Sequence, residues 1–499
     1  MLGKCDEVKK GFPVVDGTTA GGQSRHSSKE TRESGWSKGR QEDECVRKRS
    51  MERKESKVPE TAELISEVRA RWGWTEPAIW TDRMLGALES GINGVEETKW
   101  FCLIDKVYHP LNLMAAYRKT ASHKGAAGVD HVSIKAYGGQ LGRNLARVRE
   151  QLATGLYCPS KIRRTYIPKS RGKELRPLGI PTVQDRIVQT AVRQVIEPIF
   201  ERIFAEQSYG FRPERGCKDA LRRVSNLMKE GNLYIVDADL RKCFDRIPHD
   251  PLLNRVKERI ADRKVLDLIR RFLKQEILED GITTSPEEGT PQGATLSPLL
   301  CNIYLNPLDH HMEEAGFEMI RYADDLVIAC RTQEKAEEAL KRLKQWVETN
   351  GLELHPQKTR IADMTETRSH FDFLGYRFYR TKKGKLTRCP SPKSKKRLRE
   401  KLRQPTRRTN AHSMKEIIRR CNKILKGWYE YFKHSNKWVL QALDGWLRMR
   451  LRSILRKRRK RKGRGRGLDH QRWPNAYFAK LGLFSMYAAR EEATSPLGG

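Results

Sequence analysis

Two adjacent carboxylates, Asp324 and Asp325, are the residues of this chain best suited to chemistry. They lie in the string Tyr322-Ala323-Asp324-Asp325, between the short apolar runs Phe317–Ile320 and Leu326–Cys330. These runs predict two strands, with the four residues at the turn between them. Adjacent carboxylates at a tight turn repel each other unless a cation shares them. The alternatives are a solvated Asp-Asp turn and a pair that holds Mg²⁺ for phosphoryl transfer.

A third carboxylate occurs where such a metal site would need it. The segment Leu233–Asp239 predicts a mostly apolar strand with acids at its end. Asp237 and Asp239 fall on the same face of this strand, since side chains alternate with a period of two. Packing the hairpin beside the strand would bring Asp239 and the Asp324–Asp325 pair around two ions ~3.5–4 Å apart.

The segment after this strand contains further acids with structural alternatives. Asp237 is also explained as a strand-end acid, and Asp245 as a partner within a turn. Pro251 after Asp250 predicts a helix start, with Asp250 as the N-cap and Pro251 as the first helical residue.

The motifs form an ordered series. In chain order they are Lys124–Asp130, Arg163–Lys169, Arg176–Arg186, Ser208–Pro213, the segment around Asp239, Gly289–Pro298, the turn at Tyr322, Gly351–Lys358 and Phe373–Tyr376. Together they resemble the blocks of a bacterial group II intron-encoded reverse transcriptase, also called a maturase. The resemblance covers residues 120–380 or so and is specific because many blocks occur in order.

The resemblance implies an α+β fold, a right-hand polymerase with fingers and palm followed by an α-helical thumb, the X or maturase domain. It implies an RNA-directed DNA polymerase, in which a primer 3′-hydroxyl attacks the α-phosphate of a bound dNTP. Asp239, Asp324 and Asp325 match the catalytic, metal-binding triad of that family. The implied cofactor is Mg²⁺, as two ions, with Mn²⁺ as a possible substitute.

Five further positions match substrate-contacting residues of the family. Phe244 matches the steric gate that crowds a 2′-hydroxyl, with a core phenylalanine as the alternative. Lys169 and Arg176 match fingers residues that grip the triphosphate, and arginine can bind phosphate oxygens bidentately. Gln292 matches the residue that contacts the nascent pair. Lys358 matches a proton donor to pyrophosphate, although a lysine near a strand end is also commonly solvated.

Small departures occur beside these positions. Cys243 stands where the family commonly has an aromatic residue, and Ala294 where it commonly has glycine. These changes bear on fidelity or rate more than on activity. Gly293 is expected to allow a close approach of the backbone.

Composition indicates a polyanionic partner. The chain has 99 Lys and Arg against 62 Asp and Glu, a net charge of +37. Such an excess fits binding through phosphate contacts and counterion release. We expect no membrane span, since no run of ~18 apolar residues occurs, and no signal peptide. The ten cysteines are scattered without a Cys-x-x-Cys pair, which favours a reducing compartment, the bacterial cytoplasm or nucleoid.

Changes in composition and periodicity divide the chain into six parts, and the resemblance implies what several of them are. They are a polar, disordered extension (1–58), a helical beginning of the fingers (59–135), the fingers and palm (136–380), a basic linker broken by Pro390 and Pro392 (381–396), the helical thumb or X domain (397–460) and a basic, DNA-binding-like C-terminal segment (461–499).

The thumb combines an apolar stripe with many cations. Apolar residues recur at three-four spacing from Ile417 to Ile454, which predicts helices with a buried face. The cations predicted to face RNA are Arg419, Arg420, Lys423, Lys426, Arg448, Arg450 and Arg452.

A dense basic run, Arg456–Arg466, spans the end of the thumb and the start of the next segment and includes Arg458, Arg459, Lys460 and Arg461. Like charges disfavour a free helix there, so a nucleic-acid-binding arm is predicted. Trp473 and Tyr477 could stack on bases or dock this segment on the thumb.

The expected function is that of a polymerase and maturase that binds its parent intron RNA, assists splicing and copies the RNA at a target DNA for retrohoming. Nothing after Leu468 supplies the His/Cys clusters of an HNH endonuclease, so second-strand nicking is not expected. The primer would then be another strand at the target, such as a nascent strand at a replication fork. The alternatives are another bacterial reverse transcriptase (retron, diversity-generating or CRISPR-associated) and a catalytically silent RNA-binding splicing factor. An intron domain V hairpin just downstream of the coding sequence would favour the group II intron polymerase and maturase over both alternatives.

Overall fold

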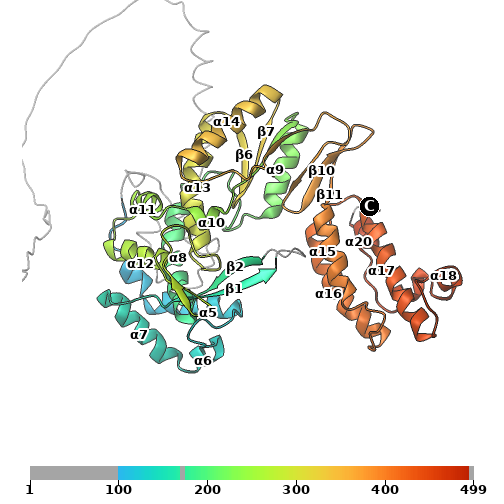
Figure 1. The fold of residues 1–499 in the computed structure, drawn as a ribbon, viewed down its shortest axis with the longest axis horizontal. Coiled ribbons are helices and arrows are strands. Elements are labelled where there is room, and N and C mark those ends of the chain that lie inside the picture. The colour runs from blue at the N-terminus through green and yellow to red at the C-terminus, as the bar shows by residue number, and fades with distance from the viewer. Residues whose placement is uncertain (1–98, 169–174, 494–499) are drawn as a thin grey trace, which may run out of the picture. The chain divides into compact units, whose positions relative to one another are not determined.

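The computed structural model describes residues 99–168 and 175–493 (Figure 1). The extension expected over 1–58, most of the segment expected over 59–135, and Lys169 lie outside the described residues.

A four-stranded antiparallel sheet forms the centre of the expected palm. Its order is β6-β7-β3-β8, with strands β3 (Tyr234–Asp239), β6 (Glu318–Tyr322), β7 (Asp325–Cys330) and β8 (Arg360–Asp363). Ile235 and Val236 point to opposite faces of β3, and both are fully buried. The sheet therefore has an apolar layer on each side.

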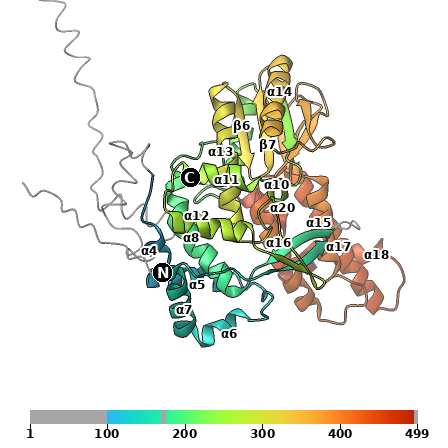
Figure 2. The same ribbon diagram turned by 60° about the vertical axis from the view of Figure 1, so that its left-hand side comes forward.

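Helices cover both faces of this sheet (Figures 1 and 2). Helices α13 (Ser297–Glu314) and α14 (Gln333–Thr349) pack on one face, and α9 (Cys217–Lys229) packs on the other. Short α10 (Cys243–Arg246) follows β3 directly, and α11 (His249–Lys257) comes next. Burial on both sides holds the strand ends, where the acids lie, in a defined register.

Helix α11 begins one residue before the predicted N-cap. Pro248 is its N-cap residue, and His249 is its first helical residue. Pro251 lies within the first turn, where its missing N–H has no intrahelical partner to lose.

The expected fingers combine helices with a second, four-stranded sheet of order β2-β1-β4-β5. The helices are α4 (Ile104–Val107), α5 (Pro110–Ser122), α6 (Ile134–Gly139), α7 (Leu141–Thr154), α8 (Val183–Glu201) and α12 (Arg263–Leu273). The strands are β1 (Ile162–Pro168), β2 (Leu175–Ile180), β4 (Ile277–Glu279) and β5 (Ile282–Thr284). Helix α8 is buried over most of its length, so it joins the fingers to the palm core.

The linker predicted over 381–396 is instead regular structure. Strand β11 (Leu386–Pro390) pairs with β10 (Tyr376–Arg380), which pairs with β9 (His370–Phe373). Helix α15 (Pro392–Arg403) then begins with Ser391 as its N-cap. Pro390 ends an edge strand and Pro392 starts a helix, positions where proline loses no required hydrogen bond. The prolines that suggested a linker thus mark element boundaries.

The C-terminal part is a helical domain with its own core. Its main helices are α16 (Met414–Phe432) and α17 (Lys437–Arg458), capped by Ser413 and Asn436. Three short helices follow, α18 (Leu468–Arg472), α19 (Asn475–Lys480) and α20 (Met486–Glu492). Trp473, Phe478 and Met486 share one apolar cluster with α15, α16 and α17. The helical domain therefore begins at α15 and includes the C-terminal segment that was expected to be separate.

None of the helices in the described ranges combines the length and the apolar content that a membrane crossing requires.

Candidate active site

The acidic turn joins β6 to β7. Tyr322 and Asp325 pair across the hairpin, so the turn itself contains only Ala323 and Asp324 and is tighter than the four residues predicted. Ala323 has a left-handed backbone with φ of 59°. Such a conformation is uncommon for a residue other than glycine and is held by its surroundings.

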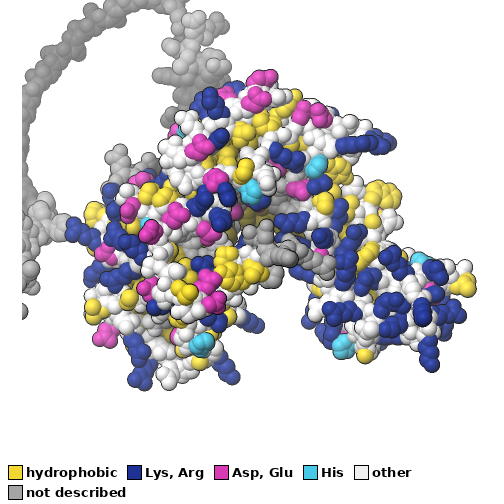
Figure 3. Space-filling view, viewed as in Figure 1, with side chains coloured by type: hydrophobic (Ala, Val, Ile, Leu, Met, Phe, Trp, Pro, Cys, Tyr) yellow, Lys and Arg dark blue, Asp and Glu magenta, His cyan; other side chains and the backbone are white. Residues whose placement is uncertain are grey.

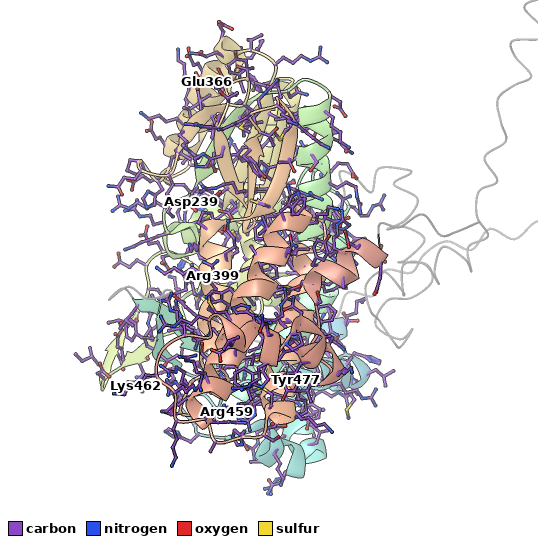
Figure 4. All side chains as sticks on the ribbon, turned by 90° about the vertical axis from the view of Figure 1, so that its right-hand side faces the viewer. Asp239, Glu366, Arg399, Arg459, Lys462 and Tyr477 are labelled. Atoms are coloured by element: carbon purple, nitrogen blue, oxygen red, sulfur yellow. The ribbon has the colours of Figure 1, made fainter. Side chains whose placement is uncertain are left out.

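Strand pairing brings the third carboxylate to this turn. Asp239, the last residue of β3, is the direct cross-strand partner of Asp325. The Leu240 N–H donates to the carbonyl oxygen of Asp324 over 3.3 Å. Directly opposed residues lie within about 5.5 Å of each other at Cβ. The structure thus brings together Asp239, Asp324 and Asp325 at one end of the palm sheet, where Asp239 is labelled in Figure 4.

Burial and mutual repulsion disfavour full ionisation of the three carboxylates Asp239, Asp324 and Asp325. Burial, with the nearby carboxylates of Asp324, Asp239 and Asp237, raises the pKa of Asp325 to about 7. Burial also raises the pKa of Asp324, and the Asp239 carboxylate adds to the shift. The positive charge of Lys358 opposes both shifts. A proton or a cation is therefore needed to stabilise the cluster near neutral pH.

The donor set fits a divalent metal ion with hard oxygen ligands, such as Mg²⁺ or Mn²⁺. Among the described residues, no group of three or more acidic, histidine or cysteine side chains is placed so that it could hold a metal ion by itself. A divalent ion bound at these carboxylates would therefore need phosphate oxygens and water to complete its coordination.

Lys358 lies against the triad. Its Nζ is 2.5 Å from Oδ2 of Asp239, and the His355 N–H of the same loop donates to the carbonyl oxygen of Asp239 over 2.8 Å. The loop after α14 is therefore tied to the end of β3. Asp237, two residues before Asp239 on β3, faces Arg360 at 3.8 Å, which agrees with a structural role for that acid.

The Gln292 side chain is oriented by Asp245, the acid that is also explained as a partner within a turn. Its Nε2 donates to both carboxylate oxygens of Asp245, over 3.0 and 3.1 Å. The backbone carbonyl oxygen of Gln292 accepts a hydrogen bond from the Gly179 N–H over 2.7 Å. The next residue, Gly293, has φ of 107°, and a Cβ there would lie 2.4 Å from the carbonyl oxygen of Gly179. The close backbone approach expected at Gly293 is thus made to strand β2.

Two of the other predicted substrate residues, Phe244 and Arg176, lie on α10 and β2. Phe244, on α10, is half-buried with its ring packed partly on the palm core. Arg176 on β2 is exposed, and it lies near enough to the cluster to oppose the rise in the pKa of Asp324. Lys169 is outside the described residues, so its position stays a prediction.

Arg321 is a supporting residue that the sequence reasoning missed. Its side chain is fully buried in β6 and forms an ion pair with Asp309, Nη2 to Oδ2 at 2.5 Å. It also donates to Asn302 Oδ1 over 2.9 Å and to Ser208 Oγ over 2.7 Å. The pair anchors Arg321, two residues before Ala323, to α13. An arginine in an apolar run, as in Met319-Ile320-Arg321, is a signal for such a buried partner.

Two family descriptions match consecutive parts of the chain. Residues 167–378 match "Reverse transcriptase (RNA-dependent DNA polymerase)", and residues 395–473 match "Group II intron, maturase-specific domain". The first match contains the three carboxylates, and the second contains most of the helical domain.

Relatives extend these matches. Protein YkfC of Escherichia coli (strain K12) is 32% identical over 361 residues, which are 64% of this chain and 89% of that protein. The chain belongs to the group II intron-encoded reverse transcriptases. Group II intron-encoded protein LtrA of Lactococcus lactis subsp. cremoris is 40% identical over 194 residues, which are 39% of this chain and 32% of that relative. A chain of a "Partial Cas6-RT-Cas1--Cas2 complex" covers 49% of this chain at 25% identity, with a TM-score of 0.32, too low to support an argument.

This reverse transcriptase is therefore an RNA-directed DNA polymerase followed by a maturase domain. The expected α+β polymerase with a helical domain after it is confirmed. Divalent metal ions are general cofactors of the family, and binding to intron RNA is implied by the maturase domain.

Mg²⁺ is expected to stabilise this reverse transcriptase against unfolding. A cation relieves the repulsion among the three carboxylates, and a ligand at 100 times its Kd adds about 2.7 kcal/mol. The midpoint of thermal unfolding should rise with added Mg²⁺, and the Asp325→Asn variant should lose most of that rise. An equal rise in the wild type and the variant would place the bound ion elsewhere.

The cations on α16 form an exposed basic face. Arg419 and Arg420 are exposed and each pairs with Glu416, at 2.6 and 2.7 Å. Lys423 and Lys426 are exposed on the same helix. Dark-blue side chains gather over the helical domain in the space-filling view (Figure 3). Surface pairs of this kind are weak, so the two arginines remain available to phosphates.

Two of the predicted cations of α17 do not belong to that face. Arg452 is 4% exposed, and it donates to the Trp473 carbonyl oxygen and to Asn475 Oδ1 over 2.8 and 2.9 Å. Arg450 donates to the hydroxyl and carbonyl oxygens of Thr406. Both cations hold segments of the domain together, and the apolar stripe alone could not reveal this.

The basic run Arg456–Arg466 begins in the last turn of α17, and the rest of it folds back on the domain. Helix α17 continues to Arg458, since cations at a helix C-terminus interact favourably with its dipole. Arg456 pairs with Asp469 at 2.7 Å, which holds the run in a loop. Figure 4 labels Arg459 and Lys462 at the end of α17 and just beyond it, and both are exposed.

The structure favours docking for Trp473. This tryptophan is 8% exposed within the core of the helical domain, and the Arg459 guanidinium lies 6.0 Å from its ring centroid. Tyr477 packs edge-to-face on Phe478. A buried ring has no face free for a nucleobase, so Trp473 stabilises the segment.

Proposed function

We propose that this reverse transcriptase binds the group II intron RNA that encodes it, assists the folding and splicing of that RNA, and copies it into a DNA target that supplies the primer. The observation that carries the proposal is the pairing of Asp239 with Asp325 beside Asp324 in a chain that also has a maturase domain.

For DNA synthesis, we assign the carboxylates of Asp239, Asp324 and Asp325 to hold two Mg²⁺ ions. The ions would neutralise charge on the attacking and leaving oxygens of the transfer. Lys358, which contacts Asp239, would give a proton to the departing pyrophosphate. Such a proton transfer contributes about 10²–10⁴-fold to a rate.

The remaining residues bind and select the nucleotide. Arg176, with Lys169, would hold the triphosphate through charge-assisted hydrogen bonds. Phe244 would crowd the 2′-hydroxyl of a ribonucleotide and so favour dNTPs. Gln292, oriented by Asp245, would contact the nascent base pair.

For RNA binding, we assign the basic face of α16 and the basic run Arg456–Arg466, which begins in the last turn of α17. The assigned residues are Arg419, Arg420, Lys423, Lys426, Arg458, Arg459, Lys460 and Arg461. Contacts of this type go to phosphates and position an RNA without reading its sequence. Specificity for the parent intron would come from RNA shape.

Two assays test the proposal. Primer extension on an RNA template with Mg²⁺ separates a polymerase from a catalytically silent splicing factor, which would bind RNA without extending. Competition between the flanking intron RNA and unrelated structured RNA of equal length tests the maturase role. Equal affinity for both RNAs would contradict the assignment of the parent intron as partner.

Removing charge from the basic run should weaken RNA binding in a salt-dependent way. For the triple variant Arg459→Gln, Lys460→Gln, Arg461→Gln, the slope of log affinity against log salt should fall by roughly 2, at about 0.7 for each phosphate contact with single-stranded RNA. Filter binding across a salt series measures the slope.

The matched control removes the same charge from the exposed residues Arg143, Arg147 and Arg149 of α7. An equal change in slope from both triple variants would show a general charge effect and contradict a binding role for the basic run Arg456–Arg466.

A further inference from the structure

Phe211 is an exposed aromatic residue that no assigned role explains. Its side chain is 43% exposed, although it sits beside the active site. Its ring centroid lies 6.4 Å from that of Phe244, nearly perpendicular at 83°, and 6.4 Å from that of Tyr322. The ring therefore stands between the proposed steric gate and the catalytic turn.

The backbone holds Phe211 in an uncommon conformation. Its φ is 60°, a left-handed value that a bulky residue adopts only when its surroundings impose it. Strained residues of this kind cluster at functional sites, where neighbouring contacts hold them. The contacts that impose this conformation come from both neighbours along the chain.

On the N-terminal side, the segment is attached to the catalytic hairpin. The Tyr209 N–H donates to the Arg321 carbonyl oxygen over 2.9 Å. The Gly210 carbonyl oxygen accepts from Asn302 Nδ2 over 2.8 Å. A Cβ at Gly210 would lie 2.4 Å from the Ala323 nitrogen, so only glycine permits this approach to the turn.

On the C-terminal side, Arg212 is a buried anchor. Its Nε donates to Glu201 over 2.9 Å, and its Nη1 donates to the Ala205 and Ser208 carbonyl oxygens over 2.6 and 2.8 Å. With both neighbours fixed, the Phe211 ring has a defined position. Its exposure is therefore a property of a rigid segment.

Phe244 needs such a neighbour. It lies on a helix of four residues that follows Lys242, itself left-handed with φ of 51°. One part of its ring packs on the palm core, and the Phe211 ring packs against another part. A gate excludes a 2′-hydroxyl only when its ring cannot move away, because a displaced ring leaves room for the extra oxygen.

We propose that Phe211 is a specificity-determining residue that holds the Phe244 ring in place and forms a second wall of the nucleotide site. The inference rests on the proposed gate role of Phe244. In this arrangement, Phe211 sets how strictly the sugar of the incoming nucleotide is selected, and this one aromatic residue joins the catalytic turn to the gate.

The test compares kcat/KM for a dNTP and the matching rNTP in single-nucleotide extension. Phe211→Ala should lower the dNTP preference about five- to tenfold, the effect of losing one aromatic pair. Phe211→Tyr keeps the ring and should keep the preference. Phe211→Asn also removes the ring, and asparagine tolerates the left-handed backbone. This variant replaces Phe211→Ala in the test if the alanine variant folds poorly.

Three further variants separate the explanations. Phe244→Ala should lose the preference by itself, and the double variant with Phe211→Ala should lose no more, since the two residues act as one unit. Phe101→Ala, at a 68% exposed phenylalanine, should match the wild type.

The outcomes are distinguishable. If Phe244→Ala lowers the preference and the Phe211 variants do not, the inference about Phe211 is wrong and the gate stands. The inference is likewise wrong if the Phe211 variants change only the KM for primer. If Phe244→Ala keeps the preference, the gate assignment fails, and the inference fails with it.

Discussion

Replacing Asp324 by alanine should lower primer extension on an RNA template by at least about 10³-fold, as expected for losing about 4 kcal/mol of metal-assisted stabilisation of the transition state. Asp324 lies at the tip of the hairpin beside the Asp239–Asp325 pair. Without it, the two remaining carboxylates hold divalent ions less well. Extension rates at saturating dNTP and Mg²⁺ measure the effect.

The loss should not come from unfolding. Removing one of three mutually repelling acids relieves repulsion, so the variant should be at least as stable as the wild type without metal. RNA binding, assigned to the helical domain, should be largely unchanged. Asp267→Ala removes an acid that is 57% exposed on α12 and should extend primers normally.

The triad should also behave as one unit. Asp239→Ala and Asp325→Ala should each cost about as much activity as Asp324→Ala, and combining them should add little. Normal extension by Asp324→Ala would show that this hairpin is not the catalytic site.

Replacing Arg321 by methionine should have the largest effect on stability. The Arg321–Asp309 pair is fully buried, and removing one partner of a buried pair typically costs about 3–5 kcal/mol, since the other charge is left uncompensated. Urea unfolding followed by circular dichroism measures the change. Polymerase activity should fall as well, because Arg321 anchors the strand that enters the catalytic turn.

Two comparisons separate burial from charge. Arg223→Met breaks an exposed pair with Glu318 on the same strand as Arg321 and should cost no more than about 1 kcal/mol. The double variant of Arg321→Met with Asp309→Leu should recover much of the loss, because a buried pair is often replaced by apolar residues with little penalty. A loss no greater than that of Arg223→Met would contradict the anchoring role.

Much of the site could be predicted from local sequence. The acids follow short apolar runs at the ends of strands, so Asp239 and the Asp324–Asp325 turn could be placed by periodicity and by the order of motifs. The helices of the thumb could be predicted in the same way, since an apolar stripe at three-four spacing is a local property. Boundaries were wrong by one or two residues at the start of α11, near Pro251, and at the turn between β6 and β7.

Other features depend on residues far apart in the chain. Pro390 and Pro392 read locally as breaks, and only the pairing of β11 with β10 shows that one ends a strand and the other begins a helix. Arg452 looked like part of a basic face, and only its burial against the C-terminal segment shows its structural role.

The sequence by itself determined which residues carry charge, most of the strands and helices, and the order of the family's motifs, because these follow from side-chain chemistry and short-range periodicity. Only the tertiary structure decided the register that places Asp239 opposite Asp325, the buried partner of Arg321, and the position of Phe211 beside Phe244. These contacts depend on packing between distant segments, and burial determines whether a charge or a ring meets solvent, a partner or a substrate.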